Sequence, residues 1–279
     1  MDERVTISIA DGVADVRLNR PDKLNALDMA MFDALVAAGD RLEGEESLRA
    51  VVLSGEGRAF CAGLDFASFM GMADGGGGDG GGGRASSAEG ASRLVATEGR
   101  ITHRAQQAAW CWQEVPVPVI AALHGAVLGG GLQIALGADL RVVAPDAQLA
   151  VAEVRWGLSP DMTASVTLPR LVGLDVAKEL AFTGRSVDGV EAARIGLATR
   201  LADDPRSAAL ALAAEIAEKN PHAVRAMKRL FNRAGRLAPG DIAAQLALER
   251  EVIADLIGSP NQVEAVMARF EKRSPVFQD

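Results

Sequence analysis

The sequence predicts an α/β protein that ends in a purely helical region. Segments Val5–Ala10 and Val13–Leu18 alternate apolar and polar residues around the turn Asp11-Gly12, which is a strong β-hairpin pattern. Strand and helix patterns then recur, and only helical periodicity remains from Arg206 onward. The 279 residues, 49% hydrophobic and 24% charged, are enough for a large core, so a globular chain is expected.

Charge and cysteine content exclude several classes of protein. With 29 Lys and Arg against 37 Asp and Glu, the formal charge of −8 argues against nucleic-acid binding, although a local site for an anionic group stays open. Cys61 and Cys111 are too few for a disulfide framework and lack metal-ligand spacing, so no metal site is expected. The first residues show no signal-peptide pattern, and polar residues and glycines interrupt the apolar stretch 119–140. We therefore expect a cytoplasmic protein with no membrane partner.

The first part of the chain is predicted in this order. Asp28 should cap a helix whose apolar positions keep helical spacing: Met31, Phe32, Leu35 and Leu42. A strand follows at 50–53, and a glycine-rich loop at 54–64 feeds a short helix. Residues 75–83, eight glycines and one aspartate, are predicted as a mobile insertion, either a tolerated surface segment or a lid over a pocket. A long helix should run from 87 to 114, where Pro116 and Pro118 stop it.

The second part begins with a buried strand, Val119–Leu123, a glycine-rich turn and a short helix at 131–136. Strands are predicted at Leu140–Val143 and 148–154, helices at 163–171, 174–182 and 187–195, and a brief strand at 198–201. In the helical region an apolar stripe joins Ile242, Leu246, Ile253 and Leu256, and Ser259 to Gln262 is a capping box with Pro260 at the first helical position. We divide the chain into a core, 1–201, and a C-terminal helical region, 202–279.

Two glycine-rich turns each lie where a predicted strand ends and a helix begins. One runs from Gly57 to Asp65 and the other from His124 to Gly131. Backbone N–H groups at such junctions are free and have the positive end of a helix dipole behind them, so two that converge can hold an oxyanion. Tight packing is the alternative explanation. The second turn is not a dinucleotide fingerprint, because it lacks the glycine spacing and the acidic ribose ligand.

Three motifs follow one another along the chain: Asn19-Arg20-Pro21 with Leu24-Asn25-Ala26-Leu27, then Ala59-Phe60-Cys61-Ala62-Gly63-Leu64-Asp65, then His124-Gly125-Ala126-Val127-Leu128-Gly129-Gly130-Gly131. In this order they resemble the crotonase (enoyl-CoA hydratase/isomerase) superfamily. The similarity is good from about residue 5 to residue 201 and looser through 270–273. It implies a crotonase-like spiral of ββα repeats with a C-terminal helical trimerisation region. It also implies a homotrimer or a dimer of trimers, an acyl-CoA substrate, and no cofactor beyond the coenzyme A that the substrate carries.

The chemistry that this resemblance implies is stabilisation of an enolate by two backbone N–H groups. By position these belong to Leu64 and Gly130, and removing one such donor typically costs about 3–4 kcal/mol. Other residues of the motifs are substrate-binding candidates: Ala26, Ala62, Gly63, Asp65 and Gly129. Asp65 is expected to brace its loop rather than to catalyse. Lys23 and Lys272 are candidates for the CoA phosphates, with solvated surface lysines as the alternative.

The acid and base residues decide the reaction. Hydratases of this superfamily carry one glutamate shortly after the glycine triplet and a second about twenty residues later. Here the first position is Gln133, which cannot exchange a proton at useful pH and stays a substrate-binding candidate, and the second is Glu153. Glu153 is expected at the end of an apolar strand, where a carboxylate is costly unless it is functional or paired, for example with Arg155. Hydration by two glutamates is therefore not expected.

Asp161 offers another carboxylate, eight residues after Glu153. Dienoyl-CoA isomerases of the superfamily have an aspartate at this place, and it shuttles a proton along the acyl chain together with the glutamate that matches Glu153. Those enzymes also carry an acid where this chain has Gln133. Asp161 is equally well placed to be the N-cap of the following helix.

These residues lead to one main hypothesis and two alternatives. We expect an enzyme of fatty-acid metabolism that acts on acyl-CoA thioesters through a stabilised enolate, with isomerisation favoured over hydration. The alternatives are a hydratase that works with a single glutamate and a non-catalytic acyl-CoA-binding protein. The alanine-rich stripe at 208–214 predicts an oligomer, because it would leave more apolar surface open than a monomer normally does.

Overall fold

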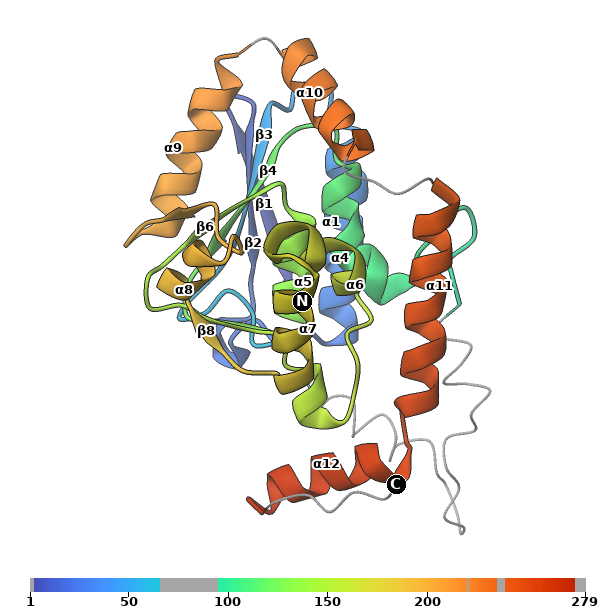
Figure 1. Cartoon of the computed structure of the whole chain (residues 1–279). Coiled ribbons are helices and arrows are strands. Elements are labelled where there is room, and N and C mark those ends of the chain that lie inside the picture. Colours follow the sequence, from blue (N-terminus) through green and yellow to red (C-terminus); the bar gives the residue numbers. More distant parts are fainter. Residues whose placement is uncertain (1–2, 66–94, 220, 235–238, 274–279) are drawn as a thin grey trace.

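The computed structural model describes residues 3–65, 95–219, 221–234 and 239–273 (Figure 1). Within these residues the strands form a six-stranded sheet in the order β1-β2-β3-β4-β6-β9 and a three-stranded sheet in the order β5-β7-β8. The strands are β1 Val5–Ala10, β2 Val13–Leu18, β3 Ala50–Gly55, β4 Val119–Leu123, β5 Ala126–Leu128, β6 Leu140–Val143, β7 Gln148–Ala150, β8 Val187–Asp188 and β9 Arg200–Leu201. Only β1 runs antiparallel to its neighbour in the larger sheet, among the described strands.

Helices follow the strands in the alternation that the sequence predicts. They are η1 Pro21–Lys23, α1 Met29–Glu43, α4 Arg104–Glu114, α5 Gly130–Gly137, η2 Glu153–Trp156, α6 Ala164–Val172, α7 Leu174–Thr183, α8 Gly189–Arg194, α9 Pro205–Ala217, α10 Pro221–Ala234, α11 Pro239–Leu256 and α12 Pro260–Phe270. The predicted α/β class is confirmed, as is the change to helices alone after β9 within the described part of the chain.

Local signals set several of these boundaries as predicted. Asp11 and Gly12 both have positive φ, 50° and 77°, and join β1 to β2. The Asp28 carboxylate accepts a hydrogen bond from Met31 N–H at 2.8 Å and caps α1. Ser259 accepts from Gln262 N–H and caps α12, with Pro260 in its first turn. Each of these signals acts within a few residues, which is why the sequence alone reveals them.

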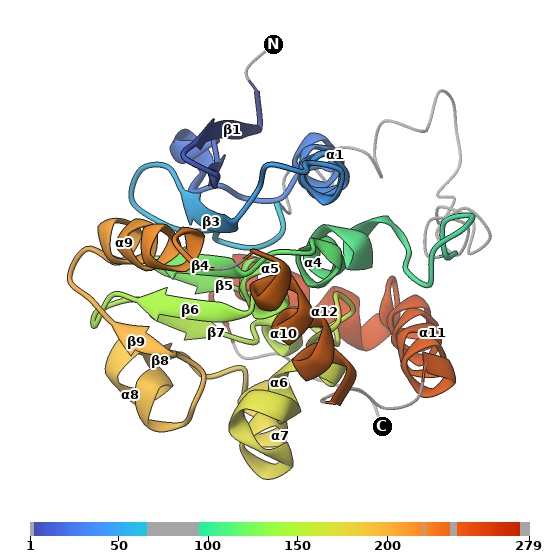
Figure 2. The same ribbon diagram turned by 90° about the horizontal axis from the view of Figure 1, so that it is seen from above.

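Helices cover both faces of the larger sheet (Figure 2). Alternate strand residues point to opposite faces. On one face α9 packs against Ala50, Val52, Ile120, Ala122 and Val142. On the other face α1, α4 and α5 share the main core with Val51, Leu53, Val119, Ala121 and Leu123. The predicted alanine-rich stripe is therefore not free surface: Ala209, Leu212 and Ala213 are buried against this sheet, so that part of the oligomer argument is wrong.

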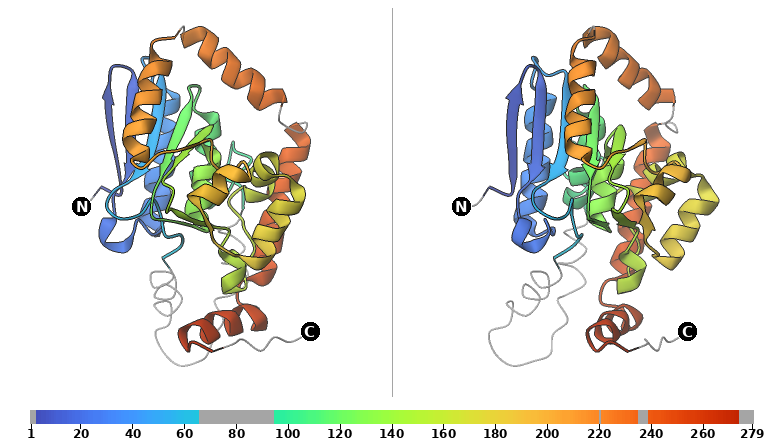
Figure 3. Two further views of the ribbon diagram at one scale, coloured as in Figure 1. Left: turned by 60° about the vertical axis from the view of Figure 1, so that its left-hand side comes forward. Right: turned by 90° about the vertical axis from the view of Figure 1, so that its left-hand side faces the viewer.

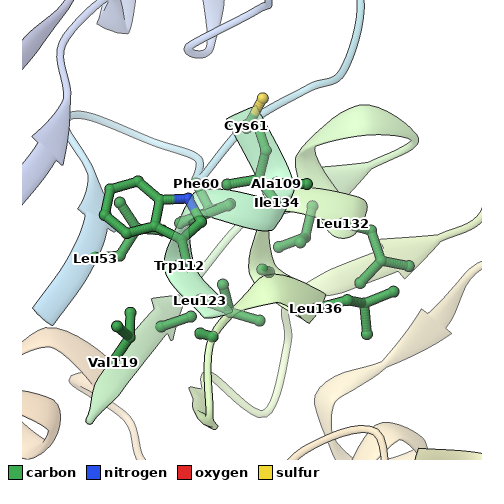
Figure 4. Close-up of a cluster of buried hydrophobic side chains, with 14 of the residues drawn as sticks. Leu53, Phe60, Cys61, Ala109, Trp112, Val119, Leu123, Leu132, Ile134 and Leu136 are labelled. Atoms are coloured by element: carbon green, nitrogen blue, oxygen red, sulfur yellow. The ribbon is translucent and has the colours of Figure 1, made fainter. Parts of the chain in front are cut away.

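Part of the main core ties the two glycine-rich turns to the sheet. Figure 4 shows Trp112 of α4 among Phe60, Leu123, Leu132 and Ile134, all of them buried. The indole Nε1 donates to the carbonyl of Ala108 one turn earlier, at 3.0 Å. Because Phe60 belongs to the first turn and Leu132 to the helix after the second, this core fixes the position of both.

Three predicted elements differ from the structure. The helix expected over 87–114 begins only at Arg104, because His103 is its N-cap and accepts from two backbone N–H groups through Nδ1. The strand expected over 148–154 ends at Ala150, where its partner β5 also ends, so Glu153 lies on η2 rather than on a strand. The helix expected over 187–195 starts at Gly189 after a short strand. The glycine-rich segment 75–83 lies outside the described residues.

The C-terminal helices reach around the core (Figure 3). Helix α10 runs from α9 toward α11, and α12 lies at the far end of α11. Lys228 of α10 anchors this arm: its Nζ lies 2.7 Å from Asp139 Oδ2 and donates to the carbonyls of Trp112 and Val117, at 3.0 and 2.9 Å. The same helix leaves apolar side chains exposed, Met227, Leu230 and Phe231.

Candidate active site

The two glycine-rich turns lie side by side as the sequence predicts. Phe60 N–H donates to the carbonyl of His124 at 2.9 Å, and Cys61 N–H donates to that of Ala126 at 3.0 Å. In return, Leu128 N–H donates to the carbonyl of Cys61 at 3.0 Å. This is parallel strand pairing, and it brings the ends of both turns to the same edge of the fold.

Leu64 and Gly130 present backbone N–H groups at this edge. Leu27 N–H donates to the Gly63 carbonyl and Asp65 N–H to the Leu27 carbonyl, so the N–H of Leu64 points away from that pairing. Gly130 is the first residue of α5, where N–H groups have no acceptor inside the helix. Within the described residues neither N–H has a protein acceptor. Both are therefore available to a ligand oxygen.

Positive φ angles at two glycines make this approach possible. Gly63 has φ of +89°, and a Cβ there would lie 2.8 Å from the carbonyl oxygen of Leu128. Gly129 has φ of +51°, and a Cβ there would lie 3.3 Å from Glu153 Oε1. A side chain at either position would be strained and would push the turns, or the carboxylate, apart.

Glu153 places its carboxylate against the second turn. Its Oε1 accepts from Gln133 Nε2 at 2.6 Å, whereas Oε2 is buried and has no hydrogen-bond partner within the described part of the chain. Burial raises the pKa of Glu153 to about 7, although its own backbone N–H and the Gln133 amide act in the opposite direction. A carboxyl group that titrates near neutral pH can both take and return a proton there.

Arg155 is not the partner of Glu153. Its guanidinium donates to the carbonyl of Gly184 at 2.7 Å and to Ser186 Oγ at 3.0 Å. Among the described residues no salt bridge joins a cation to Glu153. The alternative explanation of Glu153 as half of an ion pair with Arg155 is therefore wrong.

Gln133 is engaged by protein groups at both ends of its side-chain amide. Its Oε1 accepts from the N–H of Met162 at 2.8 Å and from that of Ala164 at 3.2 Å, and its Nε2 donates to Glu153. One amide N–H remains for a substrate, so the predicted substrate contact of Gln133 stays a prediction.

Asp161 lies in the segment between η2 and α6. The N-cap of α6 is Thr163, with φ of 79° and no side-chain capping bond, so the prediction that Asp161 caps this helix is wrong. Asp161 directly precedes Met162, whose N–H binds Gln133. Its role as a second proton carrier stays a prediction.

Arg20 braces the first turn, and sequence reasoning did not assign it a role. Its Nη1 lies 2.8 Å from Asp65 Oδ2 and 3.1 Å from the carbonyl of Ala26. The pairing agrees with the bracing role expected of Asp65. The sequence did carry a signal for Arg20, because Arg20 belongs to the first motif.

Cys61 is no nucleophile: its thiol donates to the carbonyl of Asn25 at 3.1 Å, and burial raises its pKa to about 12.

The remaining substrate-binding candidates include Ala62 of the first turn and two lysines outside the turns. Ala62 is partly buried, and its N–H donates to the carbonyl of Leu24 at 2.9 Å. Lys23 ends η1 and Lys272 follows α12, and both are exposed. Each is accessible to an anionic ligand, and their contact with CoA phosphates stays a prediction.

Helix α12 packs on η2, the short helix that begins with Glu153. The guanidinium of Arg269 lies 4.6 Å from the ring centroid of Trp156, and the ring of Phe270 lies 6.3 Å from it. Gln262 Nε2 also donates to the carbonyl of Trp156, at 3.4 Å. The C-terminal region therefore contacts η2 directly.

Two further findings concern the described residues as a group. No set of His, Cys, Asp or Glu side chains among them is arranged to hold a metal ion. None of their helices is both long and apolar enough to cross a membrane, and the apolar stretch 119–140 forms β4, β5 and α5.

Comparisons with known proteins agree with one another. The family model described as enoyl-CoA hydratase/isomerase matches residues 13–278. The chain is 36% identical over 275 residues to the "Probable enoyl-CoA hydratase" of Rhodobacter capsulatus, covering 98% of this chain and 97% of that protein. It is 34% identical over 277 residues to the "Probable enoyl-CoA hydratase echA6" of Mycobacterium tuberculosis, covering 98% and 99%. Among solved structures, an enoyl-CoA hydratase/isomerase from Pseudoalteromonas atlantica gives a TM-score of 0.81 at 28% identity, covering 99% of this chain and 100% of that one.

Proposed function

The chain belongs to the enoyl-CoA hydratase/isomerase family of the crotonase superfamily, and from this premise we propose that it moves a double bond along the acyl chain of an enoyl-CoA thioester. Its fold is the crotonase fold, and it is an enzyme of the hydratase/isomerase type. The family therefore favours the enzyme over the alternative of a non-catalytic acyl-CoA-binding protein.

In the proposed mechanism Glu153 is the base. Its carboxylate takes a proton from the carbon next to the thioester carbonyl of a 3-enoyl-CoA, and the electron pair left behind delocalises onto the thioester oxygen. The N–H groups of Leu64 and Gly130 hold that oxygen. Return of the proton to the fourth acyl carbon places the double bond between the second and third carbons. Atoms and electrons balance without a metal or redox cofactor.

One observation favours isomerisation over hydration: the side-chain oxygen of Gln133 already accepts two hydrogen bonds from the protein. Addition of water needs a group that accepts a proton from the attacking water. Gln133 Oε1 already accepts from the N–H groups of Met162 and Ala164, and an amide oxygen has two lone pairs. Within the described residues Gln133 therefore offers no such acceptor, whereas Glu153 does through its unpartnered Oε2.

Asp161 extends this proposal to a second substrate. If its carboxyl group carries a proton opposite Glu153, the proton can move between more distant acyl carbons, as a 3,5-dienoyl-CoA requires. This part of the proposal draws on the resemblance of Asp161 to the aspartate of dienoyl-CoA isomerases. It also draws on the finding that Asp161 does not cap α6.

Incubation with three thioesters tests the proposal. The purified protein receives a 2-enoyl-CoA, a 3-enoyl-CoA and a 3,5-dienoyl-CoA in separate reactions, with Glu153→Gln as the control. We expect isomerisation of a 3-enoyl or 3,5-dienoyl thioester, and a loss of about 10²–10⁴-fold in the control because the base is gone. Fast hydration of the 2-enoyl thioester would instead favour a hydratase that works with a single glutamate. Thioester binding without any turnover would support the alternative of a non-catalytic acyl-CoA-binding protein.

We also propose that residues 202–279 form an assembly region for a homotrimer or a dimer of trimers. The support is a set of exposed apolar side chains on α10: Met227, Leu230 and Phe231. The apolar face of α9 gives no such support, because the sheet covers it. Light scattering at micromolar concentration should give a multiple of three times 29.0 kDa, and Phe231→Asp should lower it. A monomer mass for the parent protein would refute this assembly. We place the enzyme in the cytoplasm, and fractionation of the source cells tests that location.

A further inference from the structure

Hydrogen bonds fix the direction in which the Gln133 amide faces. Its Oε1 receives two backbone donors, the N–H of Met162 at 2.8 Å and that of Ala164 at 3.2 Å. The amide NH₂ group only donates, so it cannot take the place of Oε1 opposite those donors. The nitrogen must therefore face Glu153 Oε1, which lies 2.6 Å away. A flipped amide would place donor against donor at Met162 and acceptor against acceptor at Glu153.

The two oxygens of the Glu153 carboxylate are consequently not equivalent. Oε1 is held between Gln133 and the Cα side of Gly129, whereas Oε2 is buried and has no partner within the described part of the chain. A base needs a free lone pair aimed at the proton that it removes. Oε2 has one, and the orientation of Oε2 depends on the bond at Oε1.

We propose that Gln133 is a positioning residue for Glu153: it holds Oε1, reserves Oε2 for proton transfer and stabilises the ionised base. The consequence for turnover rests on the proposed function. The effect on the ionisation of Glu153 does not, because it concerns the free protein alone.

The first turn of α6 supplies the anchor for this arrangement. Its first residue, Ala164, and the preceding Met162 direct their N–H groups at Gln133 Oε1. The positive end of the helix dipole lies behind them, and donors on the oxygen side of an amide polarise the N–H groups on its other side. Gln133 thereby passes the field of a helix N-terminus on to the carboxylate of Glu153.

Other charges near Glu153 do not replace this contribution. On η2 the guanidinium of Arg155 is bonded to Gly184 and Ser186, and on α12 Arg269 lies over the ring of Trp156. Asp161 lies in the segment before α6. The charged side chains of α7 are exposed: Asp175, Lys178 and Glu179. Helix α5 and strands β5 and β7 carry no titratable side chain. Burial raises the pKa of Glu153, and among the described groups only its own N–H and Gln133 oppose that rise.

Gln133→Met tests the proposal, because methionine fills a similar volume without an amide donor. The titration of Glu153 is followed in the free protein by ¹³C NMR of glutamate carboxyl carbons, with Glu153→Gln to assign its signal. A hydrogen bond to a charged group contributes about 1.5–3 kcal/mol, so we expect the midpoint to rise by about one to two pH units. At pH 7, kcat/KM for the isomerised thioester should fall about 5- to 50-fold and recover above the new midpoint. A merely structural role of Gln133 would not produce that recovery.

Gln107→Met is the matched control. Gln107 is also buried, and its Nε2 donates to Glu114 Oε2 at 2.6 Å on α4, outside the site. Its loss removes the same kind of amide-to-carboxylate bond and should leave both the Glu153 midpoint and the shape of the pH profile unchanged. A shift of the same size in this control would show a general effect of losing a buried amide and would overturn the proposal.

A second measurement covers the case in which Gln133→Met does not fold. In the wild-type protein the ¹⁵N–¹H signals of the Gln133 side chain should titrate with the midpoint of Glu153 and stop titrating in Glu153→Gln. The positioning role would be overturned if the Gln133 signals did not shift as Glu153 titrates. It would also be overturned if folded Gln133→Met left the midpoint of Glu153 unchanged. A protein that turned over no enoyl-CoA would refute the proposed function, while the titration would still decide the role of Gln133.

Discussion

Asp139 and Glu153 are two partly buried carboxylates that the fold treats in opposite ways. Asp139 Oδ2 lies 2.7 Å from Lys228 Nζ and accepts from the N–H of Val119 at 2.8 Å. Glu153 has no cation, one amide donor, and an oxygen without a partner among the described residues. A carboxylate removed from water is costly unless its charge is compensated. The fold compensates the first and leaves the second uncompensated at the edge where two free N–H groups lie.

The difference separates a structural acid from the proposed base. Asp139 and Lys228 join α10 to the core through their ion pair. For Glu153 the lack of compensation supports the proposed role, since burial brings its pKa to about 7 and leaves Oε2 available. Four predictions test this comparison, ranked by the free energy that each is expected to change.

Removal of the cation from the compensated pair should have the largest effect. Lys228→Met leaves Asp139 without its cation and two carbonyls without their donor, so the free energy of unfolding should fall by about 3–5 kcal/mol. Urea denaturation measures it, with the exposed Lys219→Met as the control that should stay within about 0.5 kcal/mol of the parent. A loss below about 1 kcal/mol would place this pair with ordinary surface ion pairs.

Removal of the uncompensated carboxylate should do the reverse and stabilise the fold. In the unfolded chain Glu153 titrates near 4.5, whereas in the folded protein it titrates near 7. Between these values the unfolded state has lost the proton and the folded state has kept it, so rising pH favours unfolding. Glu153→Gln does not titrate, so its stability relative to the parent should rise from about zero at pH 4 to at most about 3 kcal/mol at pH 8.

Unfolding in urea at pH 4 and pH 8 measures this difference for parent and variant. The same substitution removes the proposed base, so activity and stability should change in opposite directions. Equal stability of the two proteins at both pH values would show that Glu153 is not held in an unfavourable environment.

Asp161→Asn asks whether the site holds a second acid that transfers a proton. Asparagine keeps the shape and removes the titrating group, so isomerisation of a 3,5-dienoyl-CoA should fall about 100-fold, which equals about 2.7 kcal/mol of barrier. The free energy of unfolding should fall by less than about 1 kcal/mol, because asparagine keeps the shape of the side chain and the N-cap of α6 is Thr163. Steady-state kinetics on the substrate that the parent isomerises provides the measurement. Unchanged turnover would leave Glu153 as the sole acid and base.

The elements that were predicted correctly are those determined by neighbouring residues. The Asp11-Gly12 turn and the Asp28 and Ser259 caps need only contacts within a few residues. The errors arise where a distant partner decides. Strand β7 stops at Ala150 because β5 offers only three residues to pair with. Periodicity revealed an apolar face on α9 but not that the sheet covers it.

The site divides in the same way. Motif resemblance correctly predicted that the turns carrying Leu64 and Gly130 meet, because each motif is local and the order of motifs is specific. The bond between Gln133 and Glu153 was not predicted. It joins residues twenty positions apart, and its direction depends on backbone donors at Met162 and Ala164 that no side-chain pattern reveals. Sequence reasoning therefore singled out Glu153 as the candidate base but did not predict what holds its carboxylate.

Asp65 is the intermediate case, and its substitution should have the smallest effect. Asp65 follows Leu64 in the sequence, and its carboxylate is compensated by Arg20 at 2.8 Å. In Asp65→Asn the amide oxygen can still accept from Arg20, which also keeps the Ala26 carbonyl at 3.1 Å and lies 3.6 Å from Asp28. The charge and one acceptor oxygen are lost, so the free energy of unfolding should fall by about 1 kcal/mol and kcat/KM by less than about tenfold.

Asp40→Asn supplies the comparison for that value, because Asp40 pairs with Arg100 at 2.8 Å but is far more exposed, 44% against 12% for the Asp65 side chain. Its loss should change stability by about 0.5 kcal/mol or less and leave turnover alone. Urea denaturation and steady-state kinetics of the two variants together show whether the Asp65 charge serves stability or turnover. If Asp65→Asn kept its stability but lost more than about tenfold in turnover, its charge would act on the reaction, and Asp65 would belong with Glu153 rather than with Asp139.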